Sequence, residues 1–274
     1  MALLGHAMFI KYIEKLRSTG KRYFTSQEII QDLGLSGDAA RAGLYRLKRD
    51  GRLISPVSGL YVIIPPEHKS YGSIPADELI PIMMKHIDAE YYVALLSAAG
   101  FYGAAHQKPM VFQVVTNMRI KHSLKFGQVH IKLIYKKSLA DLPTKDFIVS
   151  TGYLKVATPE LIAIDLLKFP KHAGGMNNIA TVLSELVESI NVNKLIELAE
   201  KLGERYQLQR LGYIIEKIDV MDDNIKSTII ATLAEYVASD VKSYTPLASA
   251  ISRIGHPRCK KWKIIENTDF ESDL

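Results

Sequence analysis

The sequence predicts an α+β fold, in which an N-terminal winged helix-turn-helix domain precedes a larger α+β domain that ends in a helical region. Three observations predict this fold. Two short helical patterns are joined by a tight turn, and a β-prone hairpin follows a basic helix. Further along, strand patterns precede a long helical stretch. The expected parts are the winged helix-turn-helix domain 1–66, a linker 67–75, an α+β domain 76–240 and a basic, then acidic, tail 241–274.

Three helices are expected in the first domain, the first over about residues 7–18. The stretch Thr25-Ser-Gln-Glu28 is a capping box, in which a hydroxyl and a carboxylate satisfy free backbone donors at a helix start. Gly34 suits a left-handed C-terminal cap, and Ser36 is placed to cap a third helix. Two short helices joined by a glycine-containing turn predict a helix-turn-helix.

The third helix has an apolar face and a basic face. At about 100° per residue, Ala40, Leu44 and Leu47 cluster on the side that must meet the core. Arginine can contact guanine or phosphate, and tyrosine can reach the backbone or a thymine methyl group, so the opposite side is a candidate recognition surface. A solvated helix face is the alternative. The predicted DNA-contacting residues of this helix are Arg41, Ala42, Tyr45, Arg46, Lys48 and Arg49.

A small hairpin is expected directly after this helix. The β-prone runs RLIS and GLYVII are separated by Pro56, Ser58 and Gly59, which all favour turns. A hairpin at this position is a wing, whose tip would contact the DNA backbone. Ser55 and Ser58 therefore join the predicted DNA-binding residues.

Charge is distributed unevenly along the chain of 274 residues. Residues 1–66 carry 10 Lys/Arg and 5 Asp/Glu, while the remainder carries 25 and 24. Such segregation is typical of a nucleic-acid-binding module attached to a neutral domain. A single cysteine, Cys259, fits a reducing cytoplasm, and no apolar run approaches the roughly 20 residues that cross a bilayer. We expect a cytoplasmic protein without a membrane partner.

The second domain begins with helical patterns and continues with strands. DELIPIMMKHI and EYYVALLSAAGFYG are interpreted as helices, MVFQVVT and QVHIKLIYK as strands, and FIVSTGYLKV as a third apolar run. Thr158 and Pro159 then match an N-cap and the first helical position. The pattern stays helical to about Ala238, which places strands centrally and helices at the end.

Motifs for catalysis are missing from the sequence. It contains neither a phosphate-binding loop nor a Rossmann glycine pattern, and it lacks the Gly-Ser pair with two aspartates of a nucleotidyltransferase. The histidines are scattered without metal-ligand spacing. A nuclease site on Asp141 or Asp146 lacks a following Glu-x-Lys. We therefore predict a protein that is not an enzyme, with no catalytic residues, bound metal or cofactor.

One segment, residues 91–140, contains no Asp or Glu, and we call it the acid-free segment. Burial of a helix and strands explains part of this, because buried elements exclude carboxylates. The other part favours an electropositive face for DNA or an acidic partner. The candidate second basic surface consists of Arg119, Lys121, Lys125, Lys132, Lys136 and Lys137. The basic stretch RIGHPRCKKWK in the tail is either a flexible phosphate-contacting segment or a solvated terminus.

Several blocks in order carry a family resemblance: GLYRLKRDGRLISPVSGLYVIIPPE, YYVALLSAAGFYGAAHQKPMVFQVVT and YLKVATPELIAIDLL. They resemble AbiEi-type antitoxins, the antitoxin and transcriptional-regulator partners in the AbiE (type IV) toxin–antitoxin systems of phage resistance by abortive infection. The likeness covers roughly residues 20–190. The lysine-rich strands and the basic tail depart from the family pattern.

The resemblance implies a repressor that binds double-stranded operator DNA, with inverted repeats, upstream of its own operon. It also implies neutralisation of a cognate nucleotidyltransferase toxin, with or without direct contact. Two other classes remain open. One is a winged-helix regulator without a toxin partner, which senses a ligand through a pocket walled by AEYYVALL, and the other is a degenerate nuclease.

Overall fold

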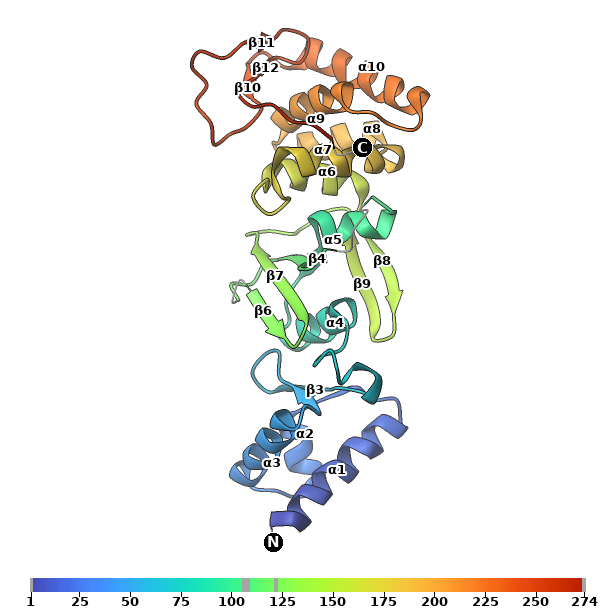
Figure 1. Cartoon of the computed structure of the whole chain (residues 1–274), viewed down its shortest axis with the longest axis vertical. Helices are drawn as coiled ribbons and strands as arrows, with labels where there is room; N and C mark the ends of the chain where they lie inside the picture. The colour runs from blue at the N-terminus through green and yellow to red at the C-terminus, as the bar shows by residue number, and fades with distance from the viewer. Residues whose placement is uncertain (1, 105–108, 121–122, 273–274) are drawn as a thin grey trace. The chain divides into compact units, whose positions relative to one another are not determined.

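The computed structural model describes residues 2–104, 109–120 and 123–272, which form two compact units (Figure 1). The first unit consists of residues 1–92, 110–139 and 146–155, and the second of residues 93–109, 140–145 and 156–274. The chain passes between the units within strands β4 (Tyr91–Val93), β8 (Thr144–Val149) and β9 (Gly152–Ala157). Helices and sheets occur in both units, so the predicted α+β class is confirmed.

The first part of unit one contains three helices and a small antiparallel sheet, with strand order β1-β3-β2. Phe24 and Ile29 are fully buried and pack with Phe9 and Leu47 in one apolar cluster. The elements are α1 (Ala2–Ser18), β1 (Tyr23–Thr25), α2 (Ser26–Leu33), α3 (Gly37–Arg49), β2 (Leu53–Ile54) and β3 (Leu60–Ile63).

The predicted capping box is present at the start of α2. The Thr25 hydroxyl accepts from the Glu28 N–H at 3.2 Å, and the Glu28 carboxylate accepts from the Thr25 N–H at 2.6 Å. Gly34 is the predicted left-handed cap at φ 61°, and the Ser36 hydroxyl caps α3 through the Ala39 N–H. The first helix begins earlier than residue 7, because apolar residues also precede that position.

The segment expected to be a linker, residues 67–75, is packed within unit one. Ser73 and Ile74 are fully buried. The Gln128 N–H donates to the Tyr71 carbonyl at 2.8 Å, between this segment and the turn before β7. The 3-10 helix η1 (Pro66–His68) begins the segment, and α4 (Ala76–His86), which contains Pro81, follows it.

A six-stranded sheet has the order β6-β7-β5-β4-β9-β8. Strands β5 (Phe112–Thr116) and β7 (Val129–Tyr135) confirm two predicted strands and run parallel, with Gln113 opposite Lys132. Strand β6 (Ser123–Phe126) is antiparallel to β7 and was not expected. The predicted helix EYYVALLSAAGFYG is wrong at its start, because Tyr91–Val93 form β4, and Val93 pairs with Val156 of β9.

The second unit contains the long helical region that the sequence predicts. Thr158 and Pro159 begin α6 as expected, and almost every residue of that helix is buried. The α-helices are α5 (Leu95–Ala99), α6 (Pro159–Lys168), α7 (Gly175–Leu186), α8 (Val192–Lys201), α9 (Arg205–Lys217) and α10 (Asp223–Asp240). The 3-10 helices are η2 (Gly100–Tyr102) and η3 (Val187–Ser189).

The C-terminal stretch forms a small sheet of β10 (Thr245–Pro246), β12 (Ile264–Ile265) and β11 (Arg258–Cys259), in that order. Trp262 is fully buried. The Gln209 amide of α9 donates to the Lys263 carbonyl at 2.9 Å and accepts from the Thr245 hydroxyl at 2.8 Å. The end of the basic stretch is therefore fixed to α9 by a buried indole and a buried amide. Its cations Arg253, Arg258, Lys260 and Lys261 are exposed, as the solvated alternative expects.

Candidate nucleic-acid interface

Helix α3 is held by its apolar face. Ala40, Leu44 and Leu47 are buried, as the helical phase predicts. Gly43 lies between them, against the Phe9 ring of α1, where an added Cβ would come 2.1 Å from Cζ. The helix therefore packs on α1 at a distance that only glycine permits, and this fixes which side faces outward.

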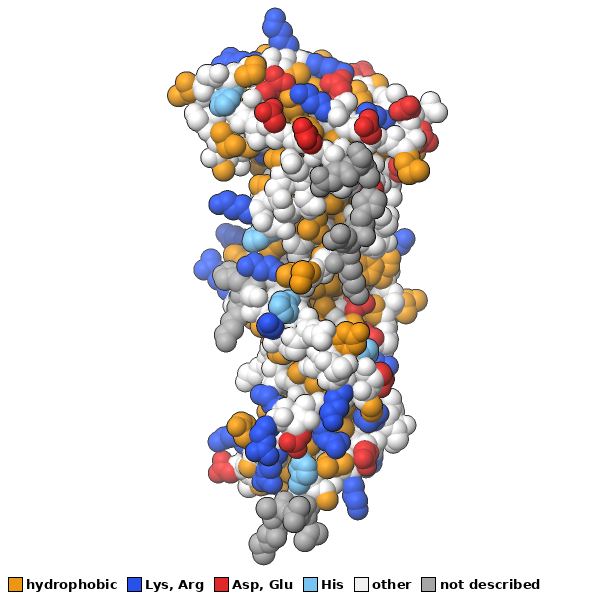
Figure 2. Space-filling view, in the orientation of Figure 1, with side chains coloured by type: hydrophobic (Ala, Val, Ile, Leu, Met, Phe, Trp, Pro, Cys, Tyr) orange, Lys and Arg blue, Asp and Glu red, His pale blue; other side chains and the backbone are white. Residues whose placement is uncertain are grey.

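The outward side of α3 carries the predicted contact residues, which we call the α3 face. Tyr45 is 65% exposed, a large fraction for an aromatic side chain. Figure 2 shows Lys and Arg side chains gathered over the region of α3. Arg41, Ala42, Tyr45, Lys48 and Arg49 are exposed, and Arg46 is half-buried.

Two acidic side chains, Asp38 and Asp50, form ion pairs with arginines of the α3 face. Arg41 Nη1 lies 3.3 Å from Asp38 Oδ1, with side chains 82% and 93% exposed, and Arg49 Nε lies 3.7 Å from Asp50 Oδ1. Exposed pairs of this kind contribute only about 0.2–1 kcal/mol. A phosphate can replace such a carboxylate at little cost, so both arginines are available to an anionic ligand.

The predicted hairpin exists, and its tip is anchored from both sides. The Ser26 N–H of α2 donates to the Gly59 carbonyl at 2.9 Å, and His86 Nε2 of α4 donates to the Ser58 carbonyl at 3.1 Å. The Ser55 hydroxyl donates to the Val57 carbonyl at 3.2 Å, whereas the Ser58 side chain is exposed. The tip therefore presents the Ser58 hydroxyl, while its backbone is held by the helices.

His86 was missed by sequence reasoning. It is separated from Ser58 by 28 residues, and a single histidine at the end of a helix has no local signal that indicates its partner. The same is true of Arg22, whose Nη1 lies 3.1 Å from Glu78 Oε2 of α4. Both contacts join α4 to the first elements of unit one.

A hydrogen bond between side chains joins helices α1 and α2 of this unit. The Tyr12 hydroxyl of α1 donates to Asp32 Oδ2 of α2 at 2.8 Å. Burial raises the pKa of Tyr12 well above its usual value, and the hydrogen bond to Asp32 raises it further. The phenol therefore stays a neutral donor at all ordinary pH values and holds α2 at a fixed angle to α1.

The candidate second basic surface is divided between the two faces of the sheet. Lys125 is opposite His130, and Lys132 is opposite Ser123, so Lys125, His130 and Lys132 lie on one face. Tyr135 is three residues after Lys132 and lies on the other face, where the Arg119 guanidinium is 4.8 Å from its ring centre.

Lys136 and Lys137 lie beyond the end of β7. The Lys136 ammonium lies 3.4 Å from the Tyr92 hydroxyl, while Lys137 is exposed. Lys121 lies outside the described residues. The structure therefore brings Lys125 and Lys132 together and separates Arg119 from them.

Two other kinds of site, a metal centre and a membrane-spanning helix, find no candidates in the part of the chain that the structure describes. Within the described ranges no group of three or more His, Cys, Asp or Glu side chains is arranged to hold a metal ion. The helices in those ranges are all too short or too polar to cross a bilayer. The segment expected to wall a ligand pocket, AEYYVALL, instead contributes β4 to the sheet and begins α5.

Residues 92–217, from β4 to the end of α9, match the family described as the AbiEi antitoxin C-terminal domain. Over these residues the sequence is similar to an AbiEi antitoxin domain. The resemblance to AbiEi-type antitoxins is thereby confirmed, and this antitoxin family is not an enzyme family. The matched residues include the described part of the acid-free segment from residue 92 onward and helices α5 to α9 of unit two.

A solved structure has a similar fold, the crystal structure of RV2827C protein from Mycobacterium tuberculosis. The two chains are 18% identical, with a TM-score of 0.63, over 93% of this chain and 89% of the other. At this identity the likeness concerns the fold alone. No curated protein matches the chain.

Proposed function

We propose that the chain is an AbiEi-type antitoxin that also represses its own operon, by binding operator DNA through residues 1–66 with a winged helix-turn-helix. The single observation that carries the DNA-binding part is the α3 face. One side of α3 is fixed by a glycine against Phe9, and the other presents Tyr45 and several cations to solvent.

The placement of charge supports a groove-binding role for this helix. Arg46 and Arg49 are on its last turns, next to the hairpin, so a helix in the major groove would bring the Ser58 hydroxyl toward a phosphate. Arginine can contact guanine with two hydrogen bonds, which gives sequence preference, while lysine supplies contacts to the backbone. The capping box and the Tyr12–Asp32 hydrogen bond keep α2 and α3 in place during binding.

The antitoxin part rests on the AbiEi domain match over residues 92–217. We assign neutralisation of a cognate nucleotidyltransferase toxin to residues 76–240, which contain that domain. The exposed side chains of Lys125 and Lys137 are candidate contacts to an anionic partner. The protein would carry out both tasks in the cytoplasm.

A footprint on the DNA upstream of the gene tests the proposal. The wild-type protein should protect inverted repeats near the promoter, and Arg46→Ala/Arg49→Ala should lose this protection. Each base-directed arginine contributes about 1–3 kcal/mol, so the double variant should bind the operator at least tenfold more weakly. The matched control is Lys11→Ala/Lys15→Ala, which removes two exposed cations from α1 instead. Unchanged operator affinity in the arginine variant would refute the assigned orientation of α3.

A further inference from the structure

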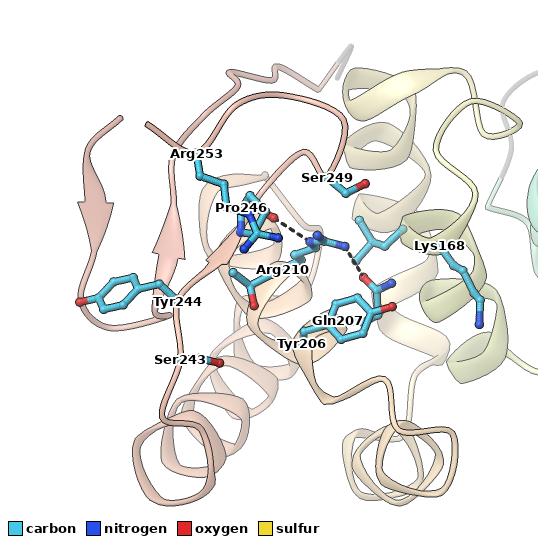
Figure 3. Close-up of a pocket in the computed structure, with 11 residues that line it drawn as sticks. Lys168, Tyr206, Gln207, Arg210, Ser243, Tyr244, Pro246, Ser249 and Arg253 are labelled. Atoms are coloured by element: carbon cyan, nitrogen blue, oxygen red, sulfur yellow. Dashed lines mark hydrogen bonds between the residues drawn. The ribbon is translucent and has the colours of Figure 1, made fainter. Parts of the chain in front are cut away.

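A pocket of about 520 Å³ lies within the second unit, between helices α6 and α9 and the segment that follows α10. Figure 3 shows Arg210 reaching across it between Pro246 and Gln207, with Arg253 beside it. The volume is in the range of roughly 300–1,000 Å³ that small-molecule sites occupy. It is therefore large enough for a ligand of several groups.

Arg210 is a buried cation with neutral partners. Its residue surface is only 5% exposed. Its Nε donates to the Pro246 carbonyl at 2.9 Å, its Nη1 donates to Gln207 Oε1 at 3.2 Å, and its guanidinium lies 5.2 Å from the ring centre of Tyr206. Since a guanidinium has five N–H donors, these two bonds leave donors for a ligand.

Burial of the Arg210 side chain disfavours its charged form. Burial lowers the pKa of Arg210, and the nearby Arg253 lowers it further, against an opposing effect of Tyr206 and Glu204. A buried charge normally has a counter-ion. Among the described residues neither Arg210 nor Arg253 forms an ion pair, and two such cations side by side repel each other. An anion between them would remove this repulsion.

The other charges of the pocket are balanced. Lys168 forms an ion pair with Glu204, and the Tyr206 hydroxyl donates to the same carboxylate. These bonds direct the carboxylate toward Lys168 and Tyr206, so it does not form an ion pair with either arginine. None of the lining residues is an Asp or Glu. The unbalanced charge of the lining is therefore that of the two arginines.

We propose that this pocket binds a small phosphate ester, with the phosphate between Arg210 and Arg253. Guanidinium groups match the geometry of phosphate oxygens, and the hydroxyls of Ser243 and Ser249 add neutral donors at the pocket wall. A bare phosphate would leave much of the volume empty, so an organic group must fill the rest, against the ring of Tyr206. This site does not depend on operator binding.

Nucleotides are suitable probes, because they join a phosphate to a planar ring. We expect AMP and ATP to bind the full-length protein in a calorimetric titration, and adenosine, which lacks the phosphate, not to bind. Arg253→Glu should weaken AMP binding by roughly tenfold or more, the usual effect of losing a charged hydrogen bond. Arg253 is exposed, so this change should leave the fold intact, and the fluorescence of buried Trp262 checks that it does.

The matched control is Lys260→Glu, which reverses an exposed charge in the same C-terminal segment outside the pocket lining. It should bind AMP as the wild type does. Absence of binding by both nucleotides at millimolar concentration would overturn the proposal, and so would equal weakening by the two charge reversals. Pyrophosphate that binds as tightly as ATP would overturn the assignment of an ester. AMP and a 5′-phosphorylated tetranucleotide, compared directly, distinguish a free nucleotide from a strand end as the source.

Discussion

The indole of Trp262 lies against Gly212 of α9, at a distance that excludes any side chain on the glycine. A Cβ added at Gly212 would come 2.0 Å from Cζ3 of the indole. Trp262 Nε1 donates to Glu216 Oε2 at 2.6 Å, one turn further along the helix. The C-terminal segment is therefore joined to α9 by both shape and a charged hydrogen bond.

Gly212→Ala should destabilise the second unit by about 1–3 kcal/mol, because the buried indole cannot move without loss of packing. Trp262 is the only tryptophan, so its fluorescence during urea unfolding reports on this unit. Gly37→Ala is the matched control, since a Cβ there meets nothing within 4 Å. An alanine variant at 212 as stable as the wild type would show that the segment is not packed as described.

Glu216 should make stability depend on pH. Burial raises the pKa of Glu216, but the hydrogen bonds from Lys261 and Trp262 lower it by more, so it lies below its usual value. A carboxyl with a lowered pKa in the folded state stabilises the protein above the unfolded pKa of about 4.3. That contribution is lost as the pH falls through the lower, folded value.

Glu216→Gln tests this dependence. The variant should be less stable than the wild type at pH 7, and the difference should shrink as the pH falls from about 5 toward 3. Urea unfolding followed by Trp262 fluorescence at each pH measures it. Glu271→Gln, which changes a carboxylate beyond the small C-terminal sheet, is the control. A stability difference that is constant over this pH range would exclude the charged form of Glu216 as its cause.

Lys125 and Lys132 should act together in binding nucleic acid, because they share one face of the sheet. If that face binds DNA, Lys125→Glu/Lys132→Glu should weaken binding across all sequences. The slope of log K against log salt should become shallower by about 1 for each phosphate that the variant no longer neutralises. Arg119→Glu changes the opposite face and should leave the slope as it is. Equal slopes for all three proteins would show that neither face binds DNA.

Repression and toxin neutralisation should be separable by substitutions in α3. The full-length Arg46→Ala/Arg49→Ala variant should fail to repress a reporter of its own promoter, yet still rescue the growth of cells that express the cognate toxin. Both arginines lie outside the matched AbiEi domain. Immunoblotting confirms equal protein levels. Loss of rescue together with repression would mean that neutralisation acts through DNA binding.

Local sequence signals predicted the first helices well. The capping box of Thr25 and Glu28 involves residues three apart, and the buried face of α3 follows from its helical phase, so both were visible in a short window. Strand β4 could not be predicted in this way, because three residues are too few to show alternation and the apolar run continues into α5. Its partner β9 lies some sixty residues later, which local patterns cannot reveal.

The candidate sites also differ in whether a short stretch of sequence could predict them. The residues of the α3 face are on one helix, and their exposure could be predicted from its phase. The phosphate-ester pocket could not be predicted from the sequence, because Lys168, Arg210 and Arg253 come from three distant segments. Arg210 lies within a run of buried residues on α9, and a single arginine in such a run does not reveal what it faces.

The parallel pairing of β4 with β9 also has a consequence for synthesis of the chain. The ribosome delivers the N-terminal helices and β4 first, and β9 only after residue 152 has emerged. Until then β4 has an open edge on the side that β9 will occupy, and the six-stranded sheet is incomplete. The nascent chain must therefore hold an unfinished sheet while about sixty further residues, from β4 to β9, are synthesised. Its early elements are exposed to chaperones and proteases for longer than those of a protein whose strands pair in sequence order.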